Sequence, residues 1–389
     1  MRRICAVITA RPSYSRIKTA LVEMAKHPQI DLKIIVGASG LLEKYGRIVD
    51  VIRADGLNVD AEVLMVLDGD GPATAAKTTG IGILEMSSAF SIIKPDAIIT
   101  IADRFETMAT AIAASYMNIP LIHVQGGEIT GSIDEKVRHS ITKLADIHVT
   151  ASQQARQRVI NLGEQPDRVF CTGCPSIDLV RDVIEKVDDE DLSGQLLAEI
   201  RKGVGADIDL RTPFIVAMQH PVTYEWSDSG QQIEQTLAAI HDIGINCFMF
   251  WPNVDSGSQI LSKSIRTFRE NNDLKNFRFF KNLPPRLFIH MLNLSSCLVG
   301  NSSAGIREAS FLGLPVINIG SRQLGRDRGA NVVDVDYNAS EIGQAIRRAV
   351  AISKWPRDTI YGDGRAGARI ANLLADVPLT SEKRLISEV

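Results

Sequence analysis

The stretch PLIHVQGGEITGSIDEKVRHSITKLADIHVT, residues 120–150, contains the repeating unit that decides the fold. PLIHVQG and IHVT are short apolar runs rich in β-branched residues and bounded by polar ones, which is typical of buried strands. Residues 133–144 between them have the length and periodicity of an amphipathic helix. Alternation of strand and helix in this way predicts a parallel sheet with helices on both of its faces.

The same alternation covers most of the chain. Further strands are predicted at RICAVIT (3–9), LKIIVGAS (32–39), AIITIAD (97–103), RVFCTG (168–173), PFIVAMQ (213–219), INCFMFW (245–251), FRFF (277–280), CLVG (297–300) and PVINIG (315–320). Further helices are predicted at 14–26, 72–92, 105–117 and 152–161. The sequence therefore predicts an α/β protein with two doubly wound, Rossmann-like domains facing a cleft.

A chain of 389 residues is long enough for two domains, each with its own core. The pattern pauses at residues 181–212, which are charged and contain no strand candidate, so we expect a linker there. The predicted domains are then residues 1–180 and 213–362. A last helix within 363–389, at about 365–376, is expected to end the chain or to pack back on the first domain.

Composition excludes several classes of protein. Hydrophobic residues make up 45% and charged residues 23%, as in an ordinary globular protein, and no apolar run reaches the length of a membrane span. The N-terminus lacks the features of a signal peptide, so a cytoplasmic protein is expected. A net charge of -3 gives no general attraction to nucleic acid or to anionic membranes.

Neither GxGxxG nor GxxxxGK[ST] occurs, which argues against a dinucleotide cofactor and against a Walker-type NTPase. Of the five cysteines, only Cys171 and Cys174, in CTGC, have redox or metal spacing. Because a zinc site would need two further ligands, we interpret CTGC as a strand end followed by a turn.

In open parallel sheets, ligands bind outside the carboxyl ends of the strands, so polar residues there are candidates for a site. Ser302 and Ser303 follow the strand CLVG where a helix N-cap belongs, and Gly305 would let a ligand approach the first-turn N–H groups. Such a helix end favours a phosphate, and Glu308 would then reach a sugar hydroxyl beside it. The alternative is a plain serine cap with a solvated glutamate.

Basic and amide side chains follow other strands. Arg11 suits a diphosphate through bidentate hydrogen bonds, although a solvated loop arginine is the alternative. His220, before a proline at a strand end, suits phosphate neutralisation or proton transfer. Asn253 ends the next strand.

Acidic side chains gather at two neighbouring strand ends. Asp103 and Arg104 follow one strand, and Glu128 and Asp134 follow the next. Carboxylates at adjacent strand ends in a cleft are candidates for removing and delivering protons. Each acid alone has a second interpretation as a helix cap, Asp134 above all.

These residues resemble those of the UDP-N-acetylglucosamine 2-epimerases, in the hydrolysing branch that supplies precursors of sialic-acid-like sugars. The resemblance covers nearly the whole chain and rests on ARPSYSR, ADRFET, HVQGGEITGSIDEKVRHSITKLAD, GCPSID, QHPVT, PNVDSGS, NSSAGIREASFLGLPVINIGSRQLGR and IYGDG, in order. It implies a glycosyltransferase-B type fold, a nucleotide held mainly by the second domain, and a homodimer or homotetramer. It also implies a nucleotide-sugar substrate and a reaction without metal or NAD.

The reaction that the resemblance implies begins with elimination of UDP across C1–C2 to give a 2-acetamidoglucal. Water then adds at C1 while C2 is reprotonated on the other face. The groups implied to stabilise the departing diphosphate are Arg11, His220, Ser302, Ser303 and the Gly305 backbone. Asp103 and Asp134 would act at C2, Glu308 would bind ribose, and Asn253 and Arg322 would bind polar groups of the substrate.

Gln125 departs from the pattern, because sialic-acid members of the family have a glutamate at this position. An amide cannot accept a proton in this pH range, so Glu128 or an aspartate must do that work, or the substrate is a different one, such as a UDP- or GDP-linked 2,4-diacetamido-2,4,6-trideoxyglucose. Further alternatives are a non-hydrolysing epimerase, a glycosyltransferase and a nucleotide-sugar-binding protein without turnover. The segment GGEITGSIDE favours the hydrolysing branch.

Overall fold

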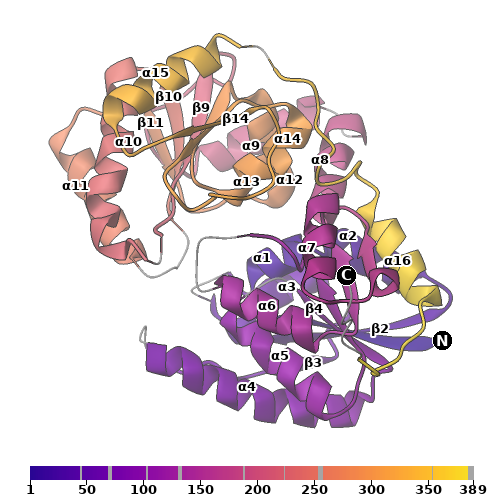
Figure 1. The fold of residues 1–389 in the computed structure, drawn as a ribbon. Helices are drawn as coiled ribbons and strands as arrows, with labels where there is room; N and C mark the ends of the chain where they lie inside the picture. The colour runs from indigo at the N-terminus through magenta and orange to yellow at the C-terminus, as the bar shows by residue number, and fades with distance from the viewer. Residues whose placement is uncertain are drawn as a thin grey trace. The chain divides into compact units, whose positions relative to one another are not determined.

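The computed structural model describes residues 1–43, 46–68, 72–101, 104–129, 134–186, 189–222, 224–252, 257–352 and 354–383. The chain divides into two compact units, each built around its own sheet (Figure 1). Unit 1 comprises residues 1–128, 133–178 and 361–389, and unit 2 comprises 129–132 and 179–360.

Unit 1 contains a seven-stranded parallel sheet with the order β3-β2-β1-β4-β5-β6-β7. Its strands are β1 Arg2–Ile8, β2 Ile30–Gly37, β3 Ala61–Val63, β4 Ala97–Ile101, β5 Leu121–Val124, β6 Ile147–Thr150 and β7 Val169–Cys171. All residues of β4, β5 and β6 are buried, because helices cover both faces of the sheet. The apolar runs in the sequence are therefore central strands.

The helices of unit 1 lie on both sides of this sheet (Figure 1). They are α1 Arg11–Ser15, α2 Lys18–Lys26, α3 Ile48–Ala54, α4 Pro72–Ile93, α5 Phe105–Tyr116, α6 Asp134–Leu144, α7 Gln153–Asn161 and α16 Ala366–Asp376, with α8 Pro175–Lys186 at the junction of the units and single 3-10 turns at Ala38–Leu41 and Pro166–Arg168. Two apolar clusters, one on each face, form the core.

Unit 2 repeats the same winding. Its sheet has the order β14-β13-β12-β9-β10-β11-β8, and all pairs are parallel except β11 with β8. The strands are β8 Val204–Gly205, β9 Phe214–Met218, β10 Asn246–Phe250, β11 Phe277–Phe280, β12 Cys297–Gly300, β13 Val316–Ile319 and β14 Val332–Val335. The helices are α9 Asp189–Ile200, α10 Ser229–Ile243, α11 Ser258–Asn271, α12 Pro285–Leu294, α13 Ser303–Ile306, α14 Glu308–Leu312 and α15 Ala339–Val350, with a 3-10 turn at Trp226–Asp228.

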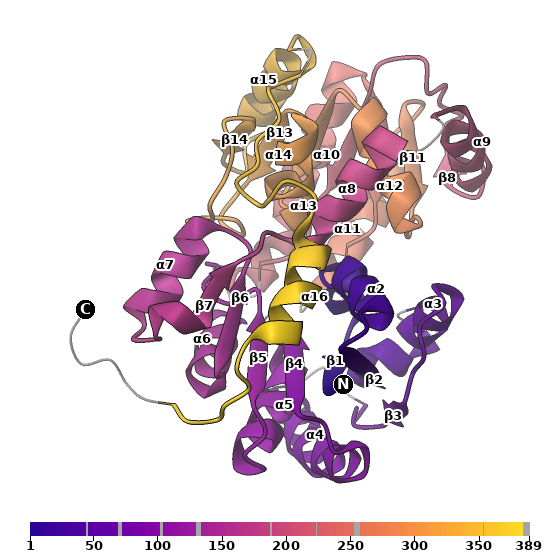
Figure 2. The same ribbon diagram turned by 90° about the vertical axis from the view of Figure 1, so that its right-hand side faces the viewer.

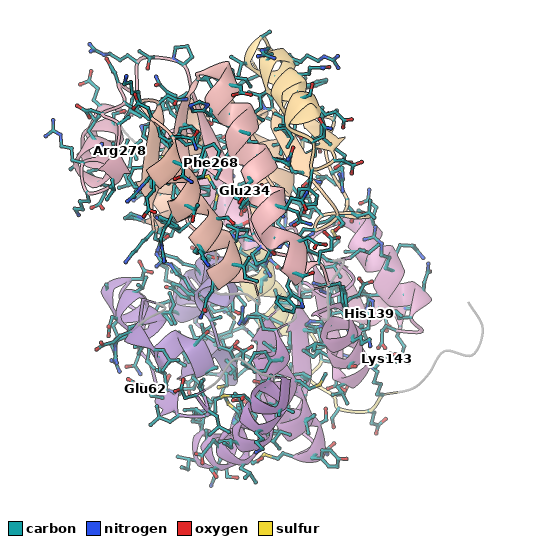
Figure 3. The ribbon with its side chains drawn as sticks, turned by 90° about the vertical axis from the view of Figure 1, so that its left-hand side faces the viewer. Glu62, His139, Lys143, Glu234, Phe268 and Arg278 are labelled. Atoms are coloured by element: carbon teal, nitrogen blue, oxygen red, sulfur yellow. The ribbon has the colours of Figure 1, made fainter. Side chains whose placement is uncertain are left out.

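The prediction of a linker at 181–212 is wrong, because this region is folded into helices and a strand. This region contains the end of α8, the helix α9 and the short strand β8, which pairs antiparallel with β11. Leu196 and Ile200 of α9 are fully or almost fully buried. The buried Arg278 of β11, labelled in Figure 3, donates to the carbonyls of Ile200 and Ala206. The segment is thus part of unit 2, because its few apolar residues suffice to anchor it.

The last helix belongs to unit 1, a point that the sequence left open. Ile370 and Leu374 of α16 are fully buried in the same cluster as Leu21 of α2, and Figure 2 shows the two helices side by side. Gly367 allows this approach, because a Cβ there would lie 2.8 Å from the carbonyl carbon of Thr19.

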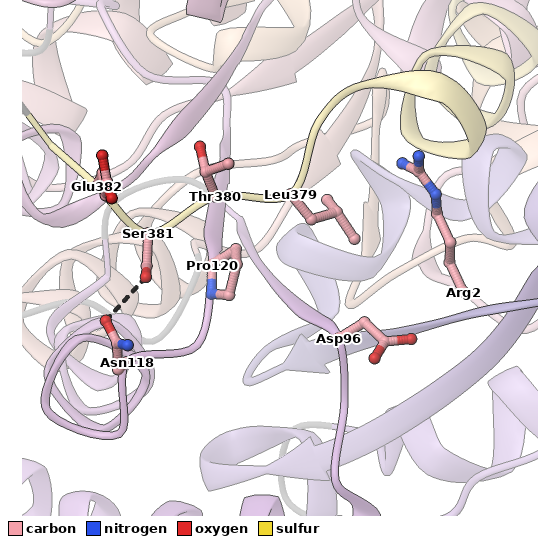
Figure 4. Close-up of a pocket in the computed structure, with 8 residues that line it drawn as sticks. All are labelled: Arg2, Asp96, Asn118, Pro120, Leu379, Thr380, Ser381 and Glu382. Atoms are coloured by element: carbon pink, nitrogen blue, oxygen red, sulfur yellow. Dashed lines mark hydrogen bonds between the residues drawn. The ribbon is translucent and has the colours of Figure 1, made fainter.

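The chain then follows the edge of the sheet at which the strands begin. Arg2 donates to the carbonyl of Val377, and Ser381 donates to the side chain of Asn118 at 2.8 Å (Figure 4). A shallow hollow of about 590 Å³ lies here, beside Asp96 and Leu379. It lies at the edge opposite to the carboxyl ends of the strands, so it is not where the sequence predicts a ligand.

The sequence missed two parallel edge strands. β3 has three residues, and β14 leaves both of its central residues, Val333 and Asp334, exposed. Neither has the apolar run of a central strand. Among the residues that the structure describes, no helix is long and apolar enough to cross a membrane.

Candidate functional site

Each unit has a point where the strand order reverses, between β1 and β4 in unit 1 and between β9 and β12 in unit 2. Loops that leave such neighbouring strands in opposite directions open a crevice, which is where doubly wound sheets bind ligands. The chain places Arg11 after β1 and Arg104 after β4. It places His220 after β9 and Ser302 after β12. Four sequence-predicted residues thus lie at the two reversal points.

In unit 2, Asn301 ties the two loops of the reversal point together. Its side-chain Oδ1 accepts the His220 N–H at 2.7 Å, and its Nδ2 donates to the His220 carbonyl at 2.8 Å. Its own carbonyl accepts from Arg322 at 3.1 Å and from Gln323 at 2.9 Å. Asn301 is fully buried and fixes the loops on either side of it.

Gly300 makes this junction possible. Its φ is +126°, and a Cβ there would lie 2.0 Å from the carbonyl oxygen of Met218 on β9. Only glycine fits this conformation without strain. The chain therefore leaves β12 close against β9, which brings Asn301 to His220.

His220 is uncharged in this environment. Burial, followed by the positive charge of Arg322, lowers the pKa of the imidazole to about 3. Of the two roles expected from the sequence, permanent phosphate neutralisation does not fit a neutral ring. A neutral imidazole suits hydrogen bonding to a ligand or taking up a proton when an anion binds.

Ser302 is the N-cap of α13, and its hydroxyl accepts the Ala304 N–H at 3.3 Å. Ser303 is the first residue of the helix and is half-buried. The expectation that Gly305 admits a ligand is wrong for this structure. Gly305 is buried, a Cβ there would lie 2.9 Å from Val316 of β13, and its N–H already donates to the Ser302 carbonyl. Gly305 therefore allows close packing of α13 on the sheet.

Arg307 breaks the helix after α13, so Glu308 begins a second short helix, α14. Glu308 is half-buried, which leaves part of its carboxylate accessible. Glu225, which sequence reasoning missed, completes this edge. Glu225 accepts from Ser321 and, at 2.8 Å, from Gln232, which fixes the loop after β9.

In unit 1, Arg11 is the first residue of α1, directly after β1 and Ala10. The helix is anchored by Tyr14, which is buried and donates to Asp55 at 2.7 Å. Burial lowers the pKa of the Arg11 guanidinium. Arg104 caps α5 and pairs with the buried carboxylate of Glu106 at 3.3 Å.

Gln125 follows β5 and has a strained backbone, with φ at +69°. Its N–H extends the sheet by donating to the Val149 carbonyl, and its side-chain amide donates to the Cys174 thiol at 3.1 Å. A non-glycine residue in this conformation is uncommon and marks a position held by its surroundings. CTGC is confirmed as a strand end, because β7 ends at Cys171, and residues 172–174 then lead into α8. Both cysteines are free.

Glu128 is almost completely buried, and its carbonyl accepts from the fully buried Arg138 of α6 at 2.6 Å. The preceding glycine serves packing inside the protein, since a Cβ at Gly127 would lie 2.2 Å from the Ala155 carbonyl oxygen. Sequence reasoning did not single out Arg138. Its helix looks basic and solvated in the sequence, and only the fold shows that this side chain points inward.

Three predicted residues lie wholly or partly outside the description. Asp103 and Asn253 are not among the described residues, and of Asp134 only its place as the first residue of α6 is described. Their assignment remains a prediction from the sequence. Within the described ranges, no group of three or more histidine, cysteine or acidic side chains is arranged to hold a metal ion.

The model of one protein family, described as UDP-N-acetylglucosamine 2-epimerase, matches residues 22–375. The chain belongs to this family. It is 32% identical over 382 residues to a UDP-N,N'-diacetylbacillosamine 2-epimerase (hydrolyzing) of Legionella pneumophila, with 98% of both chains covered. It is 28% identical to a UDP-N-acetylglucosamine 2-epimerase of Neisseria meningitidis, with 94% of this chain and 92% of the relative covered.

The fold is that of the solved members of the family. A crystal structure of UDP-GlcNAc 2-epimerase from Neisseria meningitidis, bound to UDP-GlcNAc, superposes with a TM-score of 0.80 at 17% identity, covering 96% of this chain and 99% of the other. The resemblance drawn from the sequence motifs and the two-domain α/β fold predicted from the alternation of elements are both confirmed.

Proposed function

We propose that this protein is a hydrolysing 2-epimerase that converts a UDP-linked 2-acetamido sugar into UDP and the free 2-epimeric sugar. UDP-N-acetylglucosamine is the first substrate to test, with N-acetylmannosamine as its product. The observation that carries the proposal is the edge of unit 2. There, Asn301 fixes His220 beside the N-cap Ser302, so that small polar donors are held in place without a permanent positive charge from the histidine.

Unit 2 would bind the nucleotide. The Ser302 hydroxyl and the Ser303 hydroxyl and N–H would donate to the diphosphate, and Glu308 would accept from a ribose hydroxyl. Arg322 already donates to the Asn301 carbonyl, so its guanidinium is oriented along this edge. Donors that are fixed before the reaction stabilise a leaving group without reorganising, and this is usually the largest electrostatic contribution to catalysis.

Unit 1 would act on the sugar. In the first step, the C1–O bond to the diphosphate breaks with its electron pair going to UDP, and the C2 proton goes to a carboxylate. Asp103 and Asp134 are the proposed carboxylates. In the second step, water adds its oxygen to C1 and a proton returns to C2 from the opposite face. Because the C2–H bond is not activated by a carbonyl, Arg11 must help to stabilise the departing diphosphate while the proton leaves.

Gln125 and Glu128 would contact the bound sugar and position it. Gln125 is held by Cys174 and is electrically neutral, so it would orient the substrate rather than exchange a proton. Glu128 is buried next to Arg138, which fixes the backbone of the loop. The proposal therefore assigns proton transfer to the aspartates and positioning to these two residues.

A second candidate substrate is UDP-N,N'-diacetylbacillosamine, which carries a 2,4-diacetamido-2,4,6-trideoxy sugar. The relative that is 32% identical over 98% of the chain bears this name, and this observation favours it. The neutral Gln125, where sialic-acid members have a carboxylate, also supports a substrate with different groups around the ring. Both substrates require the same elimination and hydration.

The test is incubation of the purified protein with each UDP-sugar in heavy water, followed by NMR of the products. The proposal expects free UDP and a reducing sugar that carries deuterium at C2 and has the opposite configuration there. Deuterium in an intact nucleotide sugar would instead indicate a non-hydrolysing epimerase. Binding without turnover of either substrate would overturn the catalytic proposal in favour of a nucleotide-sugar-binding protein.

A further inference from the structure

Unit 2 has a hollow that belongs to no part of the proposed nucleotide site. It has a volume of about 410 Å³ and lies between α15 and the edge strand β14. Figure 2 shows α15 next to β13 and β14. His220 and Ser302 follow the carboxyl ends of β9 and β12, whereas this hollow lies on the face of the sheet that α15 covers, two strands beyond β12. We call it the α15 hollow.

The α15 hollow has an apolar lining that the fold leaves open. Ile317 of β13 is almost fully buried, but around it Val333 is 53% exposed, Ile352 is 40% exposed and Trp355 is 37% exposed. Val333 has a neighbouring strand on one side only, because β14 is the last strand of the sheet. Exposed apolar side chains that gather around a concave surface mark a place where another molecule binds. A volume of this size is within the range of small-molecule sites, about 300 to 1,000 Å³.

Trp355 is held in position by its backbone. Its N–H donates to the Gly313 carbonyl at 2.8 Å. Gly313 has a φ of +66°, and a Cβ there would lie 2.1 Å from the Trp355 carbonyl oxygen, so the two segments pack closely. The aromatic ring is thus anchored before any ligand binds. A fixed aromatic ring beside an apolar hollow suits a flat molecule, which can pack against it by offset stacking.

The charges on α15 select the class of ligand. Arg348 lines the hollow in the last turn of the helix, and among the described residues its guanidinium has no ion-pair or hydrogen-bond partner. It lies at the same end of α15 as the exposed Ile352 and Trp355. Glu341 also lines the hollow, but it lies in the first turn, about 10 Å away along the helix axis. The apolar end of the hollow therefore has a positive side chain and not a negative one.

A second acid of the lining is already neutralised. Asp334 of β14 forms an ion pair with Arg328 and accepts from the side-chain amide of Asn318 at 2.7 Å. Its charge is thus compensated within the protein. Arg348 remains the charge in this lining that a ligand can pair with.

We propose that the α15 hollow binds a small, flat and largely apolar molecule that carries a negative charge, in the class of aromatic carboxylates and sulfonates. Its rings would pack on Ile317 and Val333 and beside Trp355, and its anionic group would accept from Arg348. Burial of apolar surface supplies affinity, and the charge-assisted hydrogen bond orients the molecule. A cation would be repelled by the guanidinium, and a neutral molecule would gain nothing from it.

The test is a fluorescence titration of the full chain with 8-anilinonaphthalene-1-sulfonate, an aromatic sulfonate. Wild type should bind it saturably, and saturating UDP should not displace it. Arg348→Gln should raise the dissociation constant about tenfold, because it removes the charge-assisted hydrogen bond. Arg347→Gln is the matched control, since this neighbouring arginine does not line the hollow, and its dissociation constant should stay within about twofold of wild type.

A matched ligand separates charge from apolar contact. N-phenyl-1-naphthylamine has the same rings without the sulfonate, so Arg348→Gln should leave its dissociation constant within about twofold of wild type. Val333→Glu should weaken both probes. Val204→Glu, at a valine that is 59% exposed on the opposite edge strand β8, should weaken neither. Both valines are exposed, so circular dichroism should show the wild-type fold for each variant.

Three results would overturn the proposal. They are no saturable binding of the sulfonate up to about 1 mM, displacement of the sulfonate by UDP, and equal dissociation constants in wild type and Arg348→Gln. An equal loss of both probes in Arg348→Gln would overturn the assignment of an anionic ligand. None of these measurements requires turnover of a nucleotide sugar, so their outcome is independent of the proposed function.

Discussion

Unit 1 and unit 2 share one winding, but their functional edges differ in how the polar groups are held in place. At the edge of unit 2, Asn301 links His220, Arg322 and Gln323 through neutral or backbone hydrogen bonds, and the histidine is kept uncharged. At the edge of unit 1, Arg11 follows β1, and the sequence places the carboxylates proposed to move protons, Asp103 and Asp134, after β4 and β5. Under the proposed function, the edge of unit 2 would hold the diphosphate in fixed geometry and the edge of unit 1 would supply the groups that move protons.

The division has a physical basis. A leaving group is stabilised best by donors that need not reorganise, which a closed net of hydrogen bonds provides. Proton transfer requires a group whose protonation changes during the cycle, and a carboxylate within reach of the sugar is such a group. Variants that affect one unit and not the other can therefore break or sharpen this comparison.

The largest effect is expected from the carboxylates of unit 1. Asp103→Asn and Asp134→Asn should each lower kcat about 10³-fold, because neither amide can take up the C2 proton. The affinity for UDP, measured by calorimetry, should stay within about twofold of wild type. Asp167→Asn, at an exposed aspartate of the same unit, is the matched control and should change neither quantity. Wild-type rates in both variants would contradict the assignment.

The next effect concerns stability, and it should be confined to unit 1. The buried carboxylate of Glu164 accepts from Lys143 and Lys383 at 2.6 Å each and from His148 at 3.1 Å. Burial raises the pKa of Glu164, but these three hydrogen bonds outweigh it and lower the pKa to about 2. Glu164→Gln should lower the free energy of unfolding by about 2 kcal/mol at pH 7, because the buried carboxylate loses its charge-assisted hydrogen bonds to two partly exposed lysines.

The pH dependence of this effect has a definite sign. A carboxylate whose folded pKa is depressed stabilises the protein above its unfolded value near 4.5, and this stabilisation is lost as the pH falls toward 2. The difference between wild type and Glu164→Gln should therefore shrink in that window. All three tryptophans lie in unit 2, so circular dichroism should detect the loss while tryptophan fluorescence reports unit 2 separately.

A matched control for Glu164 is Glu62→Gln. Glu62, labelled in Figure 3, pairs with Arg53 at 2.6 Å, but both side chains are exposed to solvent. Exposed ion pairs contribute little to stability, so this variant should unfold within about 0.5 kcal/mol of wild type. An equal loss in both variants would show that the buried cluster has no special role.

Asn301→Ala tests the closed edge of unit 2. Loss of the two side-chain hydrogen bonds to His220 should weaken UDP binding by about 2 kcal/mol, or about 30-fold, because the loop after β9 is released. Asn318→Ala removes another buried asparagine of unit 2, one strand away, which donates to Asp334. The control should cost stability without weakening UDP binding, and an equal loss of affinity in both would refute a special role for Asn301.

Ser302→Ala should weaken UDP binding about tenfold, the scale of one charge-assisted hydrogen bond to a phosphate. Ser310→Ala is the control, since this serine is buried in α14 and donates to the Ile306 carbonyl at 2.8 Å. Calorimetric titration with UDP distinguishes the two variants. Unchanged affinity for UDP in Ser302→Ala would show that the phosphate binds at another part of the edge.

The smallest effect is expected from His220→Gln as a function of pH. Because the folded pKa of His220 is lowered to about 3, the unfolded chain takes up a proton below about pH 6.5 and the folded protein does not. Wild type should lose about 1 kcal/mol of unfolding free energy from this histidine between pH 7 and 5.5, and the variant should be spared that loss. Tryptophan fluorescence during urea unfolding at the two pH values measures it, and equal slopes would show that His220 titrates normally.

Much of the fold was predictable because central parallel strands are buried on both faces. AIITI has no regular alternation of apolar and polar residues, as expected of a strand that is buried on both faces, and the stretches between such strands have the length of helices. The edge strands β3 and β14 were missed, because they are short and half-exposed. The linker expected at 181–212 failed for a related reason, since few apolar residues in a charged segment still anchored it to unit 2.

The site was predictable as a set of positions but not as a set of contacts. Strand ends are visible in the sequence, so Arg11, His220 and Ser302 could be selected there. Other features depend on residues that are distant in the chain. These are the burial of the Arg138 side chain, the hydrogen bond from Gln125 to Cys174 and the packing of Gly305 against Val316. No local pattern contains that information.

The sequence by itself determined the winding of both units and the family, because alternation of strand and helix and the order of motifs are properties of the linear chain. The tertiary structure alone decided which polar groups are buried, and with them the charge state of His220 and the cluster around Glu164. The physical reason is that a pKa and a hydrogen bond depend on distance in space and on exclusion of water. Both are set by packing between segments that the sequence keeps far apart.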